Sequence, residues 1–125
     1  MGTFHHMLEI GDFQGARFET LDALVDTGAT YTTIPRDVAA RLGVTPEEER
    51  PFRLADGRSV NYGLAWVRAR LNGREQPTLV ILGDGPQALL GAFTLEGFGL
   101  SADPVNKRLV PAEGYLVGIV SDGLS

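Results

Sequence analysis

The sequence predicts an all-β fold: a closed or nearly closed β-barrel with one or two short helices. Sixteen glycines and seven prolines divide the 125 residues into short segments, a pattern typical of strands joined by tight turns. Within these segments apolar residues often alternate with polar ones, which is the period of a half-buried strand. At this length the chain is expected to be one domain, covering residues 1–125 with a core of about residues 7–120.

The first segments predict an opening hairpin and then a helix. Leu8 and Ile10 alternate with polar neighbours, turn-forming residues occupy 11–15, and a second apolar strand leads to Asp26. This strand therefore delivers an acidic side chain at its end. Residues 35–43 predict a short helix, with a proline in the first turn and a glycine at the end.

The second half of the chain predicts the longest strand and its partners. Residues 60–71 alternate in hydrophobicity, but the parity switches at Trp66-Val67, which predicts a bulge or bend. Asn72-Gly73 is a strong hairpin signal, although the polar residues that follow could lengthen the loop. Residues 78–82 are apolar on both faces and are expected to be central in the sheet.

The last segments predict a further turn and strands. A turn is expected at 103–107 ahead of a strand at 108–110, and the apolar tail at 115–120 is strand-like. His5 and His6 are adjacent, so a strand would point them to opposite faces. No metal site is predicted from them.

Composition and charge narrow the function classes. The net charge of −5 and the absence of a basic cluster argue against a nucleic-acid partner. No apolar run reaches membrane-spanning length, and residues 1–7 do not have the form of a signal peptide. The chain has no cysteine, which fits a reducing compartment. We therefore expect a cytoplasmic protein without a membrane partner.

The most informative stretch is 24–30, in which an apolar strand runs into an acid, a hydroxyl and a glycine. The strand Ala23-Leu24-Val25 favours burial. Asp26 is therefore placed against a water-poor interior, where a lone carboxylate is costly. Thr27 and Gly28 offer a hydroxyl and a close backbone N–H to such a group. The alternative is a turn of purely structural role, which the same three residues also suit.

Three segments in a fixed order give the chain a family resemblance. After Asp26-Thr27-Gly28 comes an expected hairpin at 52–60, and then Leu89-Leu90-Gly91 with a helix-like segment at 92–97. In this order they resemble the catalytic loop, the flap and the hydrophobic-hydrophobic-glycine element of aspartic proteases. Over about residues 18–110 the chain resembles a single-domain, retroviral-type (retropepsin-like) member of a bacterial kind.

The resemblance implies a closed β-barrel of the acid-protease type and roles for three groups of residues. At Tyr31, Thr32 and Thr33 the chain departs from the retroviral enzymes, which have acidic residues there that hold the substrate backbone. The implied roles are catalysis for Asp26, Thr27 and Gly28; substrate binding for Ala29, Thr30, Leu54, Ala55, Asp56, Gly57 and Arg58; and support of the catalytic loop for Leu89, Leu90 and Gly91.

The chain contains one Asp-Thr-Gly triplet, whereas aspartic-protease chemistry takes two facing carboxylates. The resemblance therefore implies a homodimer that shares an Asp26 dyad and hydrolyses peptide or protein substrates, with no metal or cofactor. The competing interpretation is a catalytically inactive dimerisation or peptide-binding module that keeps the fold and the groove.

Overall fold

The computed structural model describes residues 3–112, and in this range the chain forms nine strands and two short helices. In chain order the elements are β1 (His5–Gly11), β2 (Phe18–Val25), β3 (Thr32–Pro35), α1 (Arg36–Leu42), β4 (Glu48–Arg53), β5 (Ser59–Leu71), β6 (Arg74–Gly83), β7 (Ala88–Leu90), α2 (Ala92–Gly97), β8 (Leu100–Asp103) and β9 (Arg108–Pro111).

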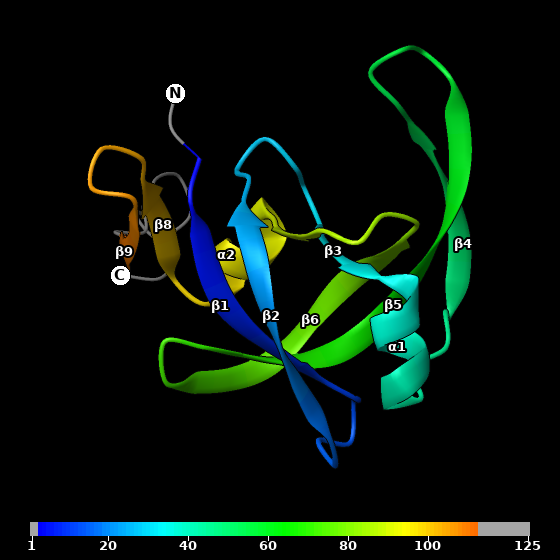
Figure 1. Cartoon of the computed structure of the whole chain (residues 1–125), viewed down its shortest axis with the longest axis horizontal. Coiled ribbons are helices and arrows are strands. Elements are labelled where there is room, and N and C mark those ends of the chain that lie inside the picture. Colours follow the sequence, from blue (N-terminus) through cyan, green and yellow to red (C-terminus); the bar gives the residue numbers. More distant parts are fainter. Residues whose placement is uncertain (1–2, 113–125) are drawn as a thin grey trace, which may run out of the picture.

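Six of the strands close into a barrel (Figure 1). The hydrogen-bonded order is β1-β2-β7-β3-β6-β5, and β5 returns to pair with β1, with Ala69 opposite Ile10. The pairs β2–β7 and β3–β6 are parallel, and the other pairs of the ring are antiparallel. Each strand of the ring is therefore paired on both sides, which confirms the predicted barrel.

The barrel is filled by inward rows of apolar side chains, and the helices pack on its outside. Helix α1 packs against β2, β3 and β6, and it ends at Gly43, whose φ of 75° makes a left-handed cap. The helices predicted at 35–43 and 92–97 are both confirmed. The buried core includes Leu8, Ile10, Ala23, Val25, Ile34, Val38, Leu42, Ala65, Val67, Ala69, Leu71, Val80, Leu82, Ala88, Leu90 and Phe98.

β5 is one uninterrupted strand, so the bulge predicted at Trp66-Val67 is wrong. Its pairing with β6 keeps a single register from Gly63 to Leu71. The switch of parity has another cause, because the neighbours Leu64 and Ala65 point to opposite faces and each is only 1% exposed. The middle of β5 is covered on both faces, so hydrophobic alternation is lost there.

The other expected turns are present. Asn72 and Gly73 have φ of 51° and 80° and form a two-residue turn between β5 and β6, so the loop is not lengthened. The segment 78–82 lies in β6 between β3 and β5, as predicted. The turn at 103–107 joins β8 and β9 into a separate two-stranded sheet. The predicted tail strand at 115–120 lies outside the described residues.

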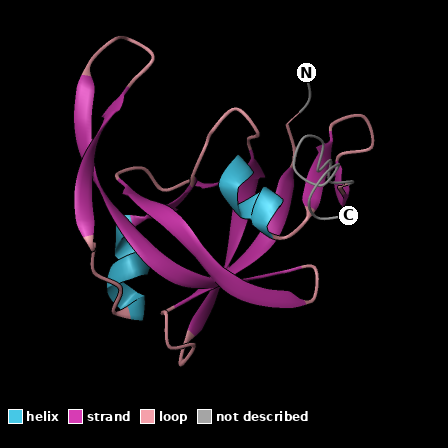
Figure 2. Ribbon diagram, turned by 180° about the vertical axis from the view of Figure 1, so that it is seen from behind, coloured by secondary structure: helices cyan, strands magenta, loops and turns pink. Residues whose placement is uncertain are grey.

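The β4–β5 hairpin stands out from the barrel. Its strands keep one register, from Glu48 opposite Leu64 to Arg53 opposite Ser59. Figures 1 and 2 show its tip extending beyond the barrel, at the same end of the molecule as the loop between β2 and β3. The fold therefore places the two segments predicted as flap and catalytic loop at one end.

Candidate active site

Asp26 begins the loop that connects β2 with β3. Its backbone N–H donates to the Leu90 carbonyl at 3.0 Å, which extends the parallel pairing of β2 with β7 by one residue. Asp26 is half-buried, and its Oδ1 accepts the backbone N–H of Gly28 at 3.0 Å. The Ala29 N–H donates to the Asp26 carbonyl at 3.1 Å. The carboxylate is therefore oriented by the backbone of its own loop.

Gly91 lies directly beneath this loop, at a point where the backbone leaves no room for a side chain. A Cβ on Gly91 would lie 2.6 Å from the carbonyl carbon and oxygen of Tyr31, and 3.0 Å from the Ala29 carbonyl oxygen. The first two N–H groups of α2 donate to the carbonyls of Ala29 and Thr30, each at 2.8 Å. The structure thus brings Leu89–Gly91 and the start of α2 against the loop that begins at Asp26.

Three buried threonines tie these parts together, and none of them was anticipated as a site residue from the sequence. The Thr32 Oγ1 accepts the Gly91 N–H at 3.0 Å and lies 2.6 Å from the Thr94 Oγ1. The Thr94 Oγ1 also lies 2.8 Å from the Thr78 Oγ1, and all three residues are at most 2% exposed. We call Gly91 and these three threonines the loop frame, since they join β3, β6 and α2 beneath the loop.

The Asp26-Thr27-Gly28 triplet faces a hollow of about 250 Å³. Asp26, Thr27 and Gly28 form one wall, and the opposite walls come from the N-terminal segment and from the β8–β9 hairpin. Thr27 also lines an adjoining hollow of about 440 Å³ beside α2 and β8. The residues that complete the smaller hollow are Thr3, Phe4, Val25, Ala102 and Pro104.

The predicted flap residues lie at the turn of the β4–β5 hairpin. The Leu54 N–H donates to the Arg58 carbonyl at 2.8 Å, and Gly57 has a φ of 91°. Asp56 accepts the Arg58 backbone N–H at 3.0 Å and the Arg58 Nε–H at 2.7 Å. These two bonds hold the pKa of the Asp56 carboxyl below its usual value, and the backbone bond has the larger effect. Within residues 3–112 no hydrogen bond joins this turn to Asp26–Thr30.

A hollow of about 330 Å³ lies between this hairpin and the barrel. Phe52 and Tyr62 line it from the hairpin, with ring centroids 6.1 Å apart. Leu89 lines it from β7, while Thr33 and Ile81 line it from β3 and β6. The hollow therefore has a largely apolar lining on the end of the molecule that carries the Asp26 loop.

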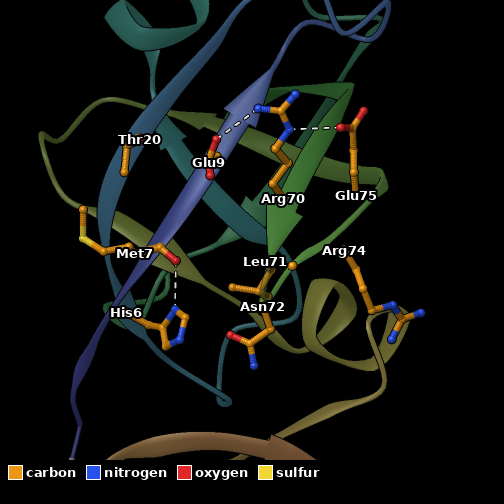
Figure 3. A pocket seen from close by; sticks show the side chains of 10 residues that line it. His6, Met7, Glu9, Thr20, Arg70, Leu71, Asn72, Arg74 and Glu75 are labelled. Carbon is orange, nitrogen blue, oxygen red and sulfur yellow. Dashed lines mark hydrogen bonds and ion pairs between the residues drawn. The ribbon is translucent and has the colours of Figure 1, made fainter.

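Another hollow, of about 420 Å³, lies between β1 and the β5–β6 hairpin (Figure 3). Figure 3 shows the Arg70 guanidinium between the carboxylates of Glu9 and Glu75, at 3.2 and 3.0 Å. The His6 ring donates to the Met7 carbonyl at 2.8 Å. Arg70 is thus paired with two carboxylates, and Arg74, which also lines this hollow, donates to the Phe98 carbonyl at 2.9 Å. The Asp26 loop, with a half-buried carboxylate held by its own backbone, is therefore the stronger candidate site.

The described range contains neither a cluster of metal ligands nor a membrane-spanning helix. In residues 3–112 no three side chains of His, Cys, Asp or Glu gather in a way that could hold a metal ion. The same range contains no helix with the length and apolar character needed to cross a bilayer.

Comparisons with known proteins agree with this site. A family model described as aspartyl protease matches residues 8–93. No curated protein matches the chain. Among solved structures, the simian foamy virus (mac) protease in solution has a TM-score of 0.55 at 19% identity, covering 75% of this chain and 93% of its own. The EIAV protease complexed with the inhibitor HBY-793 has a TM-score of 0.58 at 21% identity, with 76% and 86% covered.

The matched region contains all the site residues that the sequence predicted. It includes Asp26-Thr27-Gly28, the hairpin turn at Leu54–Arg58, and Leu89-Leu90-Gly91, whereas the β8–β9 hairpin lies beyond it. The likeness to the two viral structures adds the barrel architecture. This chain belongs to the aspartyl protease family and has the fold of the retroviral proteases.

Proposed function

We propose that this protein is a homodimeric aspartic endopeptidase in which Asp26 of each subunit supplies half of a catalytic dyad. The observation that carries the proposal is the Asp26 carboxylate at the wall of a surface hollow, oriented by the Gly28 N–H in the loop of an aspartyl protease domain. The sequence holds a single Asp-Thr-Gly triplet. A second carboxylate therefore has to come from a second copy of the chain.

The proposed chemistry needs only the two carboxylates and a water molecule. Two carboxylates a few ångströms apart do not both ionise easily, so aspartic proteases as a class share one proton between them. The ionised Asp26 takes a proton from the water, whose oxygen bonds to the carbonyl carbon of the substrate peptide. The protonated carboxyl on the other subunit donates to the carbonyl oxygen as negative charge develops. The C–N bond then breaks, and the amine leaves with a proton from the dyad.

The substrate is proposed to lie between the loop and the β4–β5 hairpin. Ala29 and Thr30 would contact it from the loop, and Leu54–Arg58 would close over it and exclude water. The hollow lined by Phe52 and Tyr62 gives an apolar side chain of the substrate a place to bind. This arrangement makes the hairpin the flap of the enzyme.

The surface beside the triplet supports association with a second copy. Thr27 and Gly28 are exposed, and the hollow that they line is also lined by Pro104. The next residue, Val105, is 84% exposed at the β8–β9 turn. An exposed apolar side chain next to the site is the kind of surface that an isologous contact covers.

The first test is cleavage of a broad peptide library between about pH 3 and pH 8. We expect the wild type to cut peptides and Asp26→Asn to lose activity by on the order of 10²–10⁴-fold, because the variant cannot supply the ionised base. Asp22→Asn is the matched control, since Asp22 is an aspartate with an exposed side chain on β2, the strand that leads to Asp26. Absence of cleavage by a folded, dimeric wild type would favour the inactive-module interpretation.

The second test asks whether the dyad is shared. When Asp26→Asn subunits exchange into the wild type at about tenfold excess, most wild-type subunits pair with an inactive copy and activity should fall roughly tenfold. The Asp22→Asn protein at the same excess should not lower the activity. Sedimentation should show a species of twice 13.4 kDa. A monomer that retains full activity would rule out the shared dyad.

A further inference from the structure

Tyr31 is the residue through which the loop that begins at Asp26 contacts the β4–β5 hairpin. Its ring stands edge-on to the ring of Phe52 on β4, with centroids 6.3 Å apart and planes at 84°. Its hydroxyl accepts a long hydrogen bond, 3.4 Å, from Arg50. Because Arg50 and Phe52 are two residues apart on one strand, they point to the same face of the hairpin, the face that meets Tyr31.

Tyr31 is also the middle member of a series of five aromatic rings. On the hairpin side Phe52 packs against Tyr62 with centroids 6.1 Å apart. On the barrel side Tyr31 packs against Phe93 of α2 at 5.9 Å, and Phe93 packs against Trp66 at 6.3 Å. The series therefore runs without a break from the hairpin, through Tyr31 and the helix beneath the loop, to the part of β5 that lies in the barrel.

Tyr31 is attached to the loop and to the hairpin by different kinds of contact. Its backbone lies against Gly91, and the residues before and after it in the chain, Thr30 and Thr32, are hydrogen-bonded to the Phe93 and Gly91 N–H groups. On the hairpin side, the bond from Arg50 is the one hydrogen bond present in the described structure between residues 48–62 and the loop 26–31. Tyr31 is thus fixed to the loop by the backbone and to the hairpin mainly by its ring.

We infer that Tyr31 is a positioning residue whose ring, through its contact with Phe52, holds the β4–β5 hairpin in its resting orientation over the Asp26 loop. The inference rests on the proposed function in one respect, since it takes the hairpin to be the flap. An aromatic edge contact is suited to this work, because it sets a preferred arrangement without locking it. The turn beyond Phe52 stays free to move when a peptide enters or leaves.

The ring is the main anchor and the hydroxyl a minor one. Arg50 already has a shorter contact, because its guanidinium donates to the Glu48 carboxylate at 2.7 and 3.0 Å. The bond from Arg50 to the Tyr31 hydroxyl is longer and competes with water. Removal of the hydroxyl alone should therefore change the local opening of the hairpin little. Removal of the whole ring should make the hairpin open more often.

The direct test is backbone hydrogen exchange of the free protein, compared among variants. In Tyr31→Ala, the amides of β4 and of β5 up to Tyr62 should exchange roughly three- to tenfold faster, the factor that corresponds to the loss of one aromatic pair. In Tyr31→Phe, these rates should stay within about twofold of wild type. Phe13→Ala is the control, because Phe13 is an aromatic residue 48% exposed on the β1–β2 turn.

The barrel strands β1 and β2 serve as the internal reference in each variant. Faster exchange confined to the hairpin in Tyr31→Ala supports the inference. Unchanged hairpin exchange in Tyr31→Ala, or the same acceleration in Phe13→Ala, overturns it. Should Tyr31→Ala not fold, Phe52→Ala removes the partner ring from the hairpin side and is held to the same outcomes.

A kinetic measurement separates positioning from chemistry. With a peptide that the wild type cleaves, Tyr31→Ala should raise KM roughly three- to tenfold and leave kcat within about twofold, and Tyr31→Phe should restore KM. A loss in kcat with KM unchanged would overturn the positioning role. If the wild type cleaves no peptide, the proposed function fails, and the exchange experiment still decides whether Tyr31 anchors the hairpin.

Discussion

The loop that carries Asp26 and the hairpin that faces it are built in opposite ways. The loop rests on the loop frame, in which backbone groups and three buried hydroxyls are hydrogen-bonded to one another beneath the Asp26 loop. The hairpin consists of β4 and the first residues of β5, up to Gly63, where β5 begins to pair with β6 in the barrel. Its contact with the loop is made mainly by half-buried rings. The loop is therefore fixed by directional hydrogen bonds, while the hairpin is held against it by aromatic contacts, which rearrange more easily.

This difference suits the work proposed for each region. General acid–base chemistry needs carboxylates held within a narrow range of positions. A flap must open for a peptide and close over it, so it has to come from a part of the chain with a low cost of local opening. Substitutions in the loop frame should therefore lower the stability of the whole fold and the activity together. Substitutions in the hairpin should change only the local opening of the hairpin.

The largest effect is expected from Gly91→Ala. The added Cβ would lie 2.6 Å from backbone atoms of Tyr31, and a backbone cannot yield as a flexible side chain can. We expect the free energy of unfolding in urea to fall by about 2–4 kcal/mol and cleavage to be lost with it. Gly85→Ala is the matched control, because a Cβ at Gly85 meets no atom within 4 Å. Equal stability of the two variants would show that Gly91 is not a tight point of the loop frame.

A smaller effect is expected from Thr94→Val. The substitution keeps the side-chain shape but removes the hydroxyl that Thr32 and Thr78 share, which leaves buried polar groups without a partner. Unfolding in urea should show a loss of about 1–3 kcal/mol. Thr94→Ser should recover most of it, and Thr20→Val at an exposed position should cost little. A neutral Thr94→Val would mean that the three hydroxyls contribute little to the loop frame.

The sequence predicted the parts of the site that are local or that follow the family order. The barrel, both helices, the two-residue turn at Asn72-Gly73, and the segments around Asp26 and Leu89–Gly91 were all expected and are present. In each of these cases a short stretch contains its own signal: a turn dipeptide, a cap, or a strand that ends in an acid. Contact between the segments followed from the resemblance alone, because spacing in the chain says nothing about pairing across a barrel.

The parts that were missed depend on pairings between distant segments. Thr32 and Thr94 are 62 residues apart, and neither has a motif around it that marks a buried hydroxyl pair. The one available signal was a threonine within an apolar strand, as at Thr78. The wrongly predicted bulge in β5 has a similar origin. Alternation reports burial on one face, and it cannot show that Leu64 is covered from the second face.

The smallest effect is expected at the hairpin turn, and it is a local one. The folded-state pKa of Asp56 lies below the ordinary value of an aspartate carboxyl, chiefly because of the Arg58 backbone N–H and then its guanidinium. A carboxyl with a lowered pKa stabilises its turn above the unfolded-state pKa, and this contribution is lost as the pH falls through the folded-state value. The Arg58 amide resonance should therefore shift with a midpoint below the ordinary range of an aspartate carboxyl. Asp56→Asn should abolish the shift but leave the titration of Asp12, which is held by the Ala16 and Arg17 amides, as it was. A midpoint at or above the ordinary value would mean that the turn is not closed by these bonds in solution, and that the hairpin tip is looser than its hydrogen bonds indicate.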